Sequence, residues 1–225
     1  RDAAIAAYTK ALEANDNYPA ASGAYGMLLF EGKSPGVVAR NMTASSGKQL
    51  VKDYKKLFAL APKDPWIRNN IGFILRDAWV AHAGQSGWNE LLKDGADAYE
   101  SACAIIGEWD DRMAQTLPFQ TRYGYAQVIS DTGLMFQFHP PIKDYDKAIM
   151  YYQRALDYSD YGYFDAFNNL RKIYAEQEDW DSLYDLAELS ADGLVRADGS
   201  PNEEGRAQAR AVMTQLVDSG KVTGN

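Results

Sequence analysis

Apolar residues recur along this chain with the period of an α-helix almost from end to end. In the segment 50–57, Leu50, Tyr54 and Leu57 are apolar, and most of the residues between them are charged. Positions i, i+4 and i+7 lie on one face of a helix, and no stretch keeps the alternation of period two that a half-buried strand requires. The pattern therefore predicts an all-α fold with helices over residues 2–15, 18–31, 47–61, 65–82, 89–107, 118–138, 144–158, 162–177, 180–194 and 201–218.

Glycine and proline separate these predicted helices. Breaker clusters fall between them at Gly32–Gly36, Gly84–Gly87, His139–Pro141 and Asp198–Ser200. The last cluster leads into a helix start, because a serine, a proline and a nearby glutamate are a typical N-cap, first position and first turn. The sequence therefore predicts that the final helix begins at Pro201, capped by Ser200.

One helix pattern recurs along the chain: a small, an aromatic and a small residue at i, i+4 and i+7. The clearest copies are Ala4/Tyr8/Ala11 and Ala148/Tyr152/Ala155, and the weaker ones are Leu50/Tyr54/Leu57, Ala98/Ala102/Ile105 and Leu183/Ala187/Ser190. The copies begin 46, 48, 50 and 35 residues apart. A period of this order is typical of stacked helix pairs, and the longer intervals require insertions.

The junction between the second and third copies carries a known motif. Arg68, Ile71, Gly72 and Leu75 follow the spacing W-x2-L-G-x2-Y, and Leu50, Tyr54 and Pro62 precede them at the A-x3-F and proline positions. This resembles the tetratricopeptide repeat (TPR) family, with arginine, leucine and leucine in place of the motif's tryptophan, tyrosine and alanine. The resemblance implies an α-solenoid in which each pair has a leading and a trailing helix. We expect residues 1–225 to form one such domain of about five antiparallel pairs with long insertions.

The composition limits the classes of molecule that this chain is expected to bind. The chain has 225 residues, a net charge of −8 and a pI near 4.8, so it has no basic excess with which to bind a nucleic acid. No apolar run approaches the roughly 18 residues of a membrane span, and we expect no membrane insertion. The single cysteine, Cys103, lies in an apolar setting and is expected to be buried. The chain begins at Arg1 without methionine, so we expect a segment of a longer protein; the cytoplasm is favoured, and export from a bacterium stays open.

Motifs for chemistry are sparse. His82 and His139 are far apart, and neither HExxH nor CxxC occurs, so no metal site is predicted. Phosphate-binding and nucleophile motifs are missing too, and we expect no cofactor and no catalytic residue. The acidic clusters 108–111 and 176–181 pair carboxylates with tryptophan, as glycosidase sites do, but such acids also cap helices. A fragment of an α-hairpin (toroidal) carbohydrate-active enzyme therefore remains an alternative, as does a purely architectural spacer.

The TPR resemblance implies a function as an interaction scaffold, because leading helices of that family line a concave groove that binds a peptide or helix of a partner. On helix 65–82, Asn69, Phe73 and Arg76 lie off the predicted core face, and on helix 162–177 Asn168 and Lys172 do so. Asparagine can bind a peptide backbone in both directions, and a basic side chain can bind a carboxylate. These five residues are the predicted partner-binding residues. Phe73 is expected to face solvent unless an inserted helix covers it.

Overall fold

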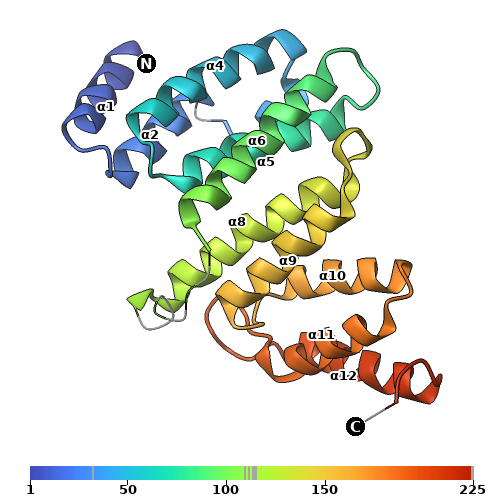
Figure 1. Ribbon diagram of the computed structural model, residues 1–225. Helices are drawn as coiled ribbons and strands as arrows, with labels where there is room; N and C mark the ends of the chain where they lie inside the picture. Colours follow the sequence, from blue (N-terminus) through green and yellow to red (C-terminus); the bar gives the residue numbers. More distant parts are fainter. Residues whose placement is uncertain (32, 109, 111, 113–115, 224–225) are drawn as a thin grey trace. The chain divides into compact units, whose positions relative to one another are not determined.

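A computed structural model describes residues 1–31, 33–108, 110, 112 and 116–223, and these form eleven α-helices and one short 3₁₀ helix (Figure 1). Isolated bridges at Val195 are the extent of β pairing in the described residues. The all-α prediction is therefore confirmed. The chain divides into two compact units, residues 1–107 and 108–225, where the sequence suggested one domain. Whether the two form one continuous stack stays a prediction, and each unit is described by itself.

Unit 1 contains six of these helices. They are α1 (Asp2–Ala14), α2 (Pro19–Leu29), α3 (Pro35–Asn41), α4 (Ala44–Leu60), α5 (Pro65–Ala81) and α6 (Trp88–Ile106). Helix α2 packs against α4, and α5 packs against both α4 and α6 (Figure 1). The apolar positions predicted for the core of α5, among them Ile67, Ile71 and Leu75, are all buried. The periodicity of the sequence thus identified the inward face of this helix.

Unit 2 contains the remaining helices of the described chain. They are α8 (Phe119–Phe138), η1 (Pro140–Ile142), α9 (Tyr145–Ser159), α10 (Phe164–Glu176), α11 (Trp180–Gly193) and α12 (Glu203–Asp218). Each α-helix packs against the next one in the chain, as the short connections require (Figure 1). Tyr152 of α9 is fully buried, as its place between Ala148 and Ala155 predicted.

Helix α3 is absent from the sequence-based prediction. The segment around Ser34, Pro35 and Gly36 was expected to break structure, but Pro35 occupies the first position of a seven-residue helix, where its fixed φ is favourable. Residue Gly32, the start of the predicted breaker cluster, lies outside the described residues. Helix α3 packs against α5, so the long first interval of the repeat contains a helix that covers part of unit 1.

The start of α12 also differs from the prediction. Its N-cap is Asn202, whose side chain accepts a hydrogen bond from the backbone N–H of Gly205 (3.1 Å). Pro201 instead pairs with Val195, where the backbone N–H of Arg196 donates to the carbonyl of Ser200 (2.8 Å). Long-range backbone pairing therefore keeps Ser200 and Pro201 out of the helix.

Glycines of three helices lie against tyrosines of the helices that pack on them. A Cβ added to Gly26 of α2 would lie 3.2 Å from the hydroxyl of Tyr54 in α4. A Cβ added to Gly72 of α5 would lie 2.7 Å from the ring of Tyr99 in α6, and the same construction brings Gly133 of α8 within 2.9 Å of Tyr152 in α9. The absence of a side chain lets each tyrosine ring lie directly against its neighbouring helix.

This packing corrects the register of the copy in α6. The predicted copy is Ala98, Ala102 and Ile105, but Ile105 is only half-buried, whereas Tyr99 is fully buried. The copy is therefore Gly95/Tyr99/Ala102, again with a small, an aromatic and a small residue at i, i+4 and i+7. The aromatic ring decides the register because it fills the space above Gly72.

Candidate partner-binding surface

Helix α5 presents the first set of predicted partner-binding residues. Its start is fixed locally: Asp64 is the N-cap and accepts a hydrogen bond from the backbone N–H of Trp66 (2.9 Å), and Pro65 is the first helical residue. Once the apolar face is buried, Asn69, Phe73 and Arg76 follow one another along an adjacent stripe of the helix, three or four residues apart.

Asn69 is half-buried and incompletely hydrogen-bonded. Its side-chain oxygen is buried and accepts no hydrogen bond from the described residues. A buried carbonyl oxygen without a donor is unfavourable by about 1–3 kcal/mol. The neighbouring Asn70 is exposed and offers a matched residue for comparison.

Phe73 was expected to face solvent, but its side chain is not fully exposed. Its side chain is half-buried and packs against the apolar core of unit 1. The guanidinium of Arg76 lies 4.8 Å from the centre of the Phe73 ring, and Arg76 also pairs with Asp77 (3.2 Å). Because only 13% of the Arg76 side chain is exposed, these two residues contribute to the packing of α5 as well as to its surface.

Helix α10 presents the second set. The side-chain oxygen of Asn168 accepts two hydrogen bonds from Arg171, from Nε (3.1 Å) and from Nη2 (2.9 Å). Lys172 is exposed, and its ammonium lies 3.5 Å from the side-chain oxygen of Asn169. Lys172 is therefore available to an acidic group of a partner.

The structure brings each set together along its own helix. Asn69, Phe73 and Arg76 belong to unit 1, and Asn168 and Lys172 belong to unit 2. A single binding groove that contains both sets therefore stays a prediction.

Arg68, the residue before Asn69, is buried and centres a polar network that the sequence pattern did not predict. Arg68 donates hydrogen bonds to the carbonyls of Ala61 (3.3 Å) and Asp64 (2.8 Å) and to the hydroxyl of Ser101 (3.0 Å). Its guanidinium also lies 4.6 Å from the centre of the Phe58 ring. Burial lowers the pKa of Arg68, and the Asp64 carboxylate opposes this shift. Arg68 thus links the end of α4 to α5 and α6 from the position at which the TPR motif has tryptophan.

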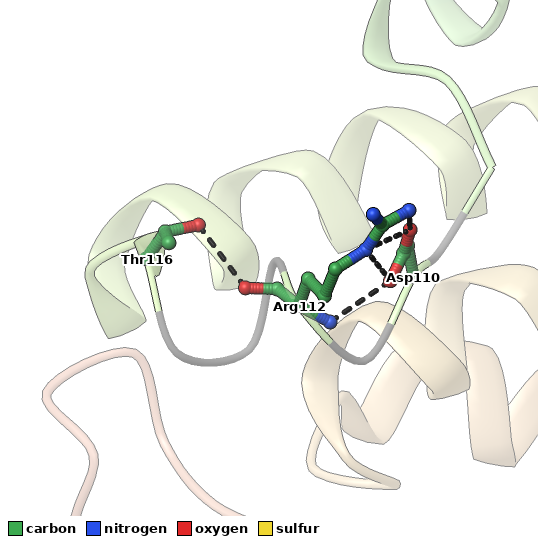
Figure 2. Close-up of polar contacts among 3 residues, drawn as sticks. All are labelled: Asp110, Arg112 and Thr116. Atoms are coloured by element: carbon green, nitrogen blue, oxygen red, sulfur yellow. Dashed lines mark hydrogen bonds and ion pairs between the residues drawn. The ribbon is translucent and has the colours of Figure 1, made fainter.

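The first acidic cluster is partly described. Asp110 accepts hydrogen bonds from the backbone N–H of Arg112 (2.9 Å) and from its side chain, where Nη2 lies 2.6 Å away (Figure 2). The hydroxyl of Thr116 donates a hydrogen bond to the backbone carbonyl of Arg112 (3.3 Å). The side-chain hydrogen bond from Arg112 lowers the pKa of Asp110, which is the opposite of what a general acid requires. Trp109 and Asp111 lie outside the described residues.

The second acidic cluster has structural roles. Asp179 is the N-cap of α11 and accepts a hydrogen bond from the backbone N–H of Ser182 (3.2 Å), as the helix-capping interpretation predicted. Glu176 accepts a hydrogen bond from the hydroxyl of Tyr145 (2.6 Å). These two hydrogen bonds hold the carboxylates of Asp179 and Glu176 at helix ends.

The surroundings of Asp157, a carboxyl group with a raised pKa, bear on the enzyme alternative. Partial burial raises the pKa of Asp157 on α9, and the charge of Glu108 adds to the shift. Glu108, however, is 86% exposed at its side chain and lies 3.4 Å from the guanidinium of Arg154. The Glu108 side chain is thus open to water, whereas a glycosidase needs its catalytic acid in a site protected from water.

The two histidines have local packing roles. The ring of His82 stacks on Trp88 (centroids 4.5 Å apart), and buried His139 lies with Nδ1 2.9 Å from the carbonyl of Met135. In the described part of the chain, no group of three or more histidine, cysteine or acidic side chains is placed to bind a metal ion. Cys103 is buried, as predicted. None of the described helices is both long and apolar enough to cross a membrane.

A cavity of about 320 Å³ accompanies the unpredicted helix α3. Its apolar lining includes Phe30, Val37, Val38, Met42 and Leu50, from α2, α3 and α4 and the turns beside them. The sequence signal that could have found it is the start Ser34-Pro35 followed by two adjacent valines.

Comparison with known proteins adds no family. The chain matches no protein-family model, and no curated protein matches its sequence.

Proposed function

We propose that this chain is a non-enzymatic scaffold of the TPR-like type, an α-solenoid of about five helix pairs that binds a peptide or helix of a partner protein. Glycine–tyrosine packing carries this proposal, because it recurs in α2–α4, α5–α6 and α8–α9. Stacked pairs of this kind build extended surfaces from leading helices, which suit elongated partners.

The proposed contact residues are Asn69, Phe73 and Arg76 of α5 and Asn168 and Lys172 of α10. Asn69 offers the clearest test among these residues, since its buried oxygen lacks a donor among the described residues. Rotation of the Asn69 side chain would bring this oxygen to the surface, where a peptide N–H of the partner would satisfy it and fix the direction of the bound backbone. Lys172 would bind an acidic group of the partner.

We favour the scaffold over a fragment of a carbohydrate-active enzyme. The carboxylate of Asp110 is held by Arg112, and that of Asp179 caps α11. Asp157 has a raised pKa, but its acidic neighbour Glu108 is exposed. These features support structural roles for the acidic clusters.

Selection from a displayed library of random peptides on the immobilised chain tests the proposal. The best peptide is then measured by calorimetry against the wild type, Asn69→Ala and the matched Asn70→Ala variant. We expect Asn69→Ala to weaken binding about tenfold, the effect of losing one buried hydrogen bond of about 1.4 kcal/mol, and Asn70→Ala to leave it unchanged. Failure to select any peptide, or equal losses in both variants, would remove the proposed surface.

A further inference from the structure

A groove lies between two trailing helices in each unit. In unit 1 it runs between α4 and α6 and has a volume of about 190 Å³; in unit 2 it runs between α9 and α11 and has a volume of about 180 Å³. A leading helix forms the floor, with Ile71 of α5 in the first groove and Leu170 of α10 in the second. This surface is distinct from the polar stripe of α5 that carries Asn69.

The two grooves are built from equivalent positions of the repeat. When Tyr54 is matched with Tyr152, and Tyr99 with Ala187, most of the residues that line the first groove fall on residues that line the second. Phe58 then corresponds to Leu156, Ala98 to Leu186, and Asp97 to Asp185. An apolar floor with an aspartate at the same position of the repeat therefore occurs twice, and the first groove has a second aspartate, Asp94.

The paired aspartates are available for binding. Asp97 and Asp185 are both exposed, and neither forms an ion pair or hydrogen bond with any described residue. Each carboxylate lines a groove beside buried apolar side chains, Ala98 and Leu186 respectively. A ligand for such a site combines an apolar stem with a positive end.

The first groove already shows that chemistry within the chain. Lys55 of α4 lines this groove, and its ammonium lies 3.3 Å from the carboxylate of Asp94 on α6. The alkyl chain of Lys55 thus lies along the groove, and its ammonium pairs with an acid on the opposite helix. The equivalent positions of the second groove hold uncharged Gln153 and Ser182.

We propose that each groove binds one lysine or arginine side chain of a partner protein. The alkyl stem lies over the floor at Ile71 or Leu170, and the charged end meets Asp97 or Asp185. Each groove would thereby be a recognition site for one basic side chain on the trailing helices, distinct from the surface on the leading helices. This inference does not depend on the proposed function.

An NMR titration of the ¹⁵N-labelled full chain tests it, with Nα-acetyl-lysine methylamide as the probe. The norleucine counterpart, which has a similar stem and no charge, is the comparison. We expect saturable shifts of the backbone amides of Asp97 and Ser101 in one groove and of Asp185 and Leu189 in the other. Asp97→Asn should weaken binding at the first groove roughly fivefold and leave the second unchanged, and Asp185→Asn should do the reverse.

Each groove therefore serves as the control for the other, and Glu90→Gln on α6 supplies the same charge change outside the groove. Absent shifts at these amides, equal binding of norleucine, or an equal loss in Glu90→Gln would overturn the proposal. The grooves could instead bind a second copy of the chain, and sedimentation of the unliganded wild type and variants tests this. Self-association of the wild type that Asp97→Asn or Asp185→Asn abolishes would assign the grooves to that second copy and would also overturn the proposal.

Discussion

At the scale of single residues, the most informative positions are glycines inside helices. Glycine in a helix interior costs up to about 1 kcal/mol relative to alanine, so its presence in α2, α5 and α8 needs a reason. The reason is the tyrosine that lies against each one, at distances that leave no room for a Cβ. At the equivalent positions of α10 and α11, both the glycine and the tyrosine are replaced: Arg171 stands at the glycine position and Ala187 at the tyrosine position.

Gly72→Ala tests this packing. A Cβ at this position would lie 2.7–2.9 Å from three ring carbons of Tyr99, which is fully buried and cannot move freely. We expect a loss of about 1–3 kcal/mol in the free energy of unfolding, measured by urea denaturation. Gly23→Ala in α2 is the control, since nothing lies within 4 Å of its added Cβ, and it should stabilise the chain by up to about 1 kcal/mol. Equal effects of the two substitutions would show that the close approach is unimportant.

At the scale of helices, local signals set the starts and distant contacts set the junctions. Thr43 begins α4 with a reciprocal capping box with Ser46, and Asp144 caps α9 through the backbone N–H of Lys147 (3.0 Å). The junction between α4 and α5 depends instead on Arg68, which satisfies two carbonyls there and a hydroxyl on α6. One buried side chain thus determines how three helices meet.

Arg68→Ala should therefore destabilise the chain strongly. It removes the hydrogen bonds that Arg68 donates to the carbonyls of Ala61 and Asp64 and to the hydroxyl of Ser101, and it removes the cation above Phe58. The Ala61 carbonyl keeps a hydrogen bond from the backbone N–H of Asp64 (3.3 Å). We expect a loss of about 3 kcal/mol in the free energy of unfolding, because hydrogen bonds to charged groups contribute about 1.5–3 kcal/mol each and are not additive. Arg68→Lys should recover only part of this, since an ammonium cannot reproduce the planar fork. A change below about 1 kcal/mol in Arg68→Ala would contradict this role.

At the scale of the molecule, each unit buries a core of its own. Unit 1 encloses residues such as Leu57 and Leu91, and unit 2 encloses residues such as Ile129 and Phe167. A unit of roughly 110 residues is large enough to fold alone, as many domains of that size do.

Separate expression of residues 1–107 and 108–225 tests the division. We expect each piece to show helical circular dichroism and a single cooperative transition in denaturant, because each unit buries a core of its own. A piece that is helical but unfolds without cooperativity would show that the division does not mark an independent folding unit.

The sequence alone determined the helical class, most helix positions and the inward face of α5. These follow from local physics: the 3.6-residue period of apolar side chains, proline and glycine at the breaks, and acids at the caps. The burial of Tyr152 and Cys103 and the capping role of Asp179 were predictable for the same reason.

Only the tertiary structure decided what each face meets. Helix α3 covers part of unit 1, Phe73 packs on the core, Tyr99 sets the register of α6, and the pairing of Val195 with Pro201 delays the start of α12. The grooves lined by Asp97 and Asp185 likewise need three helices each. Such features depend on residues far apart in the chain, which the local pattern of apolar and polar positions does not encode.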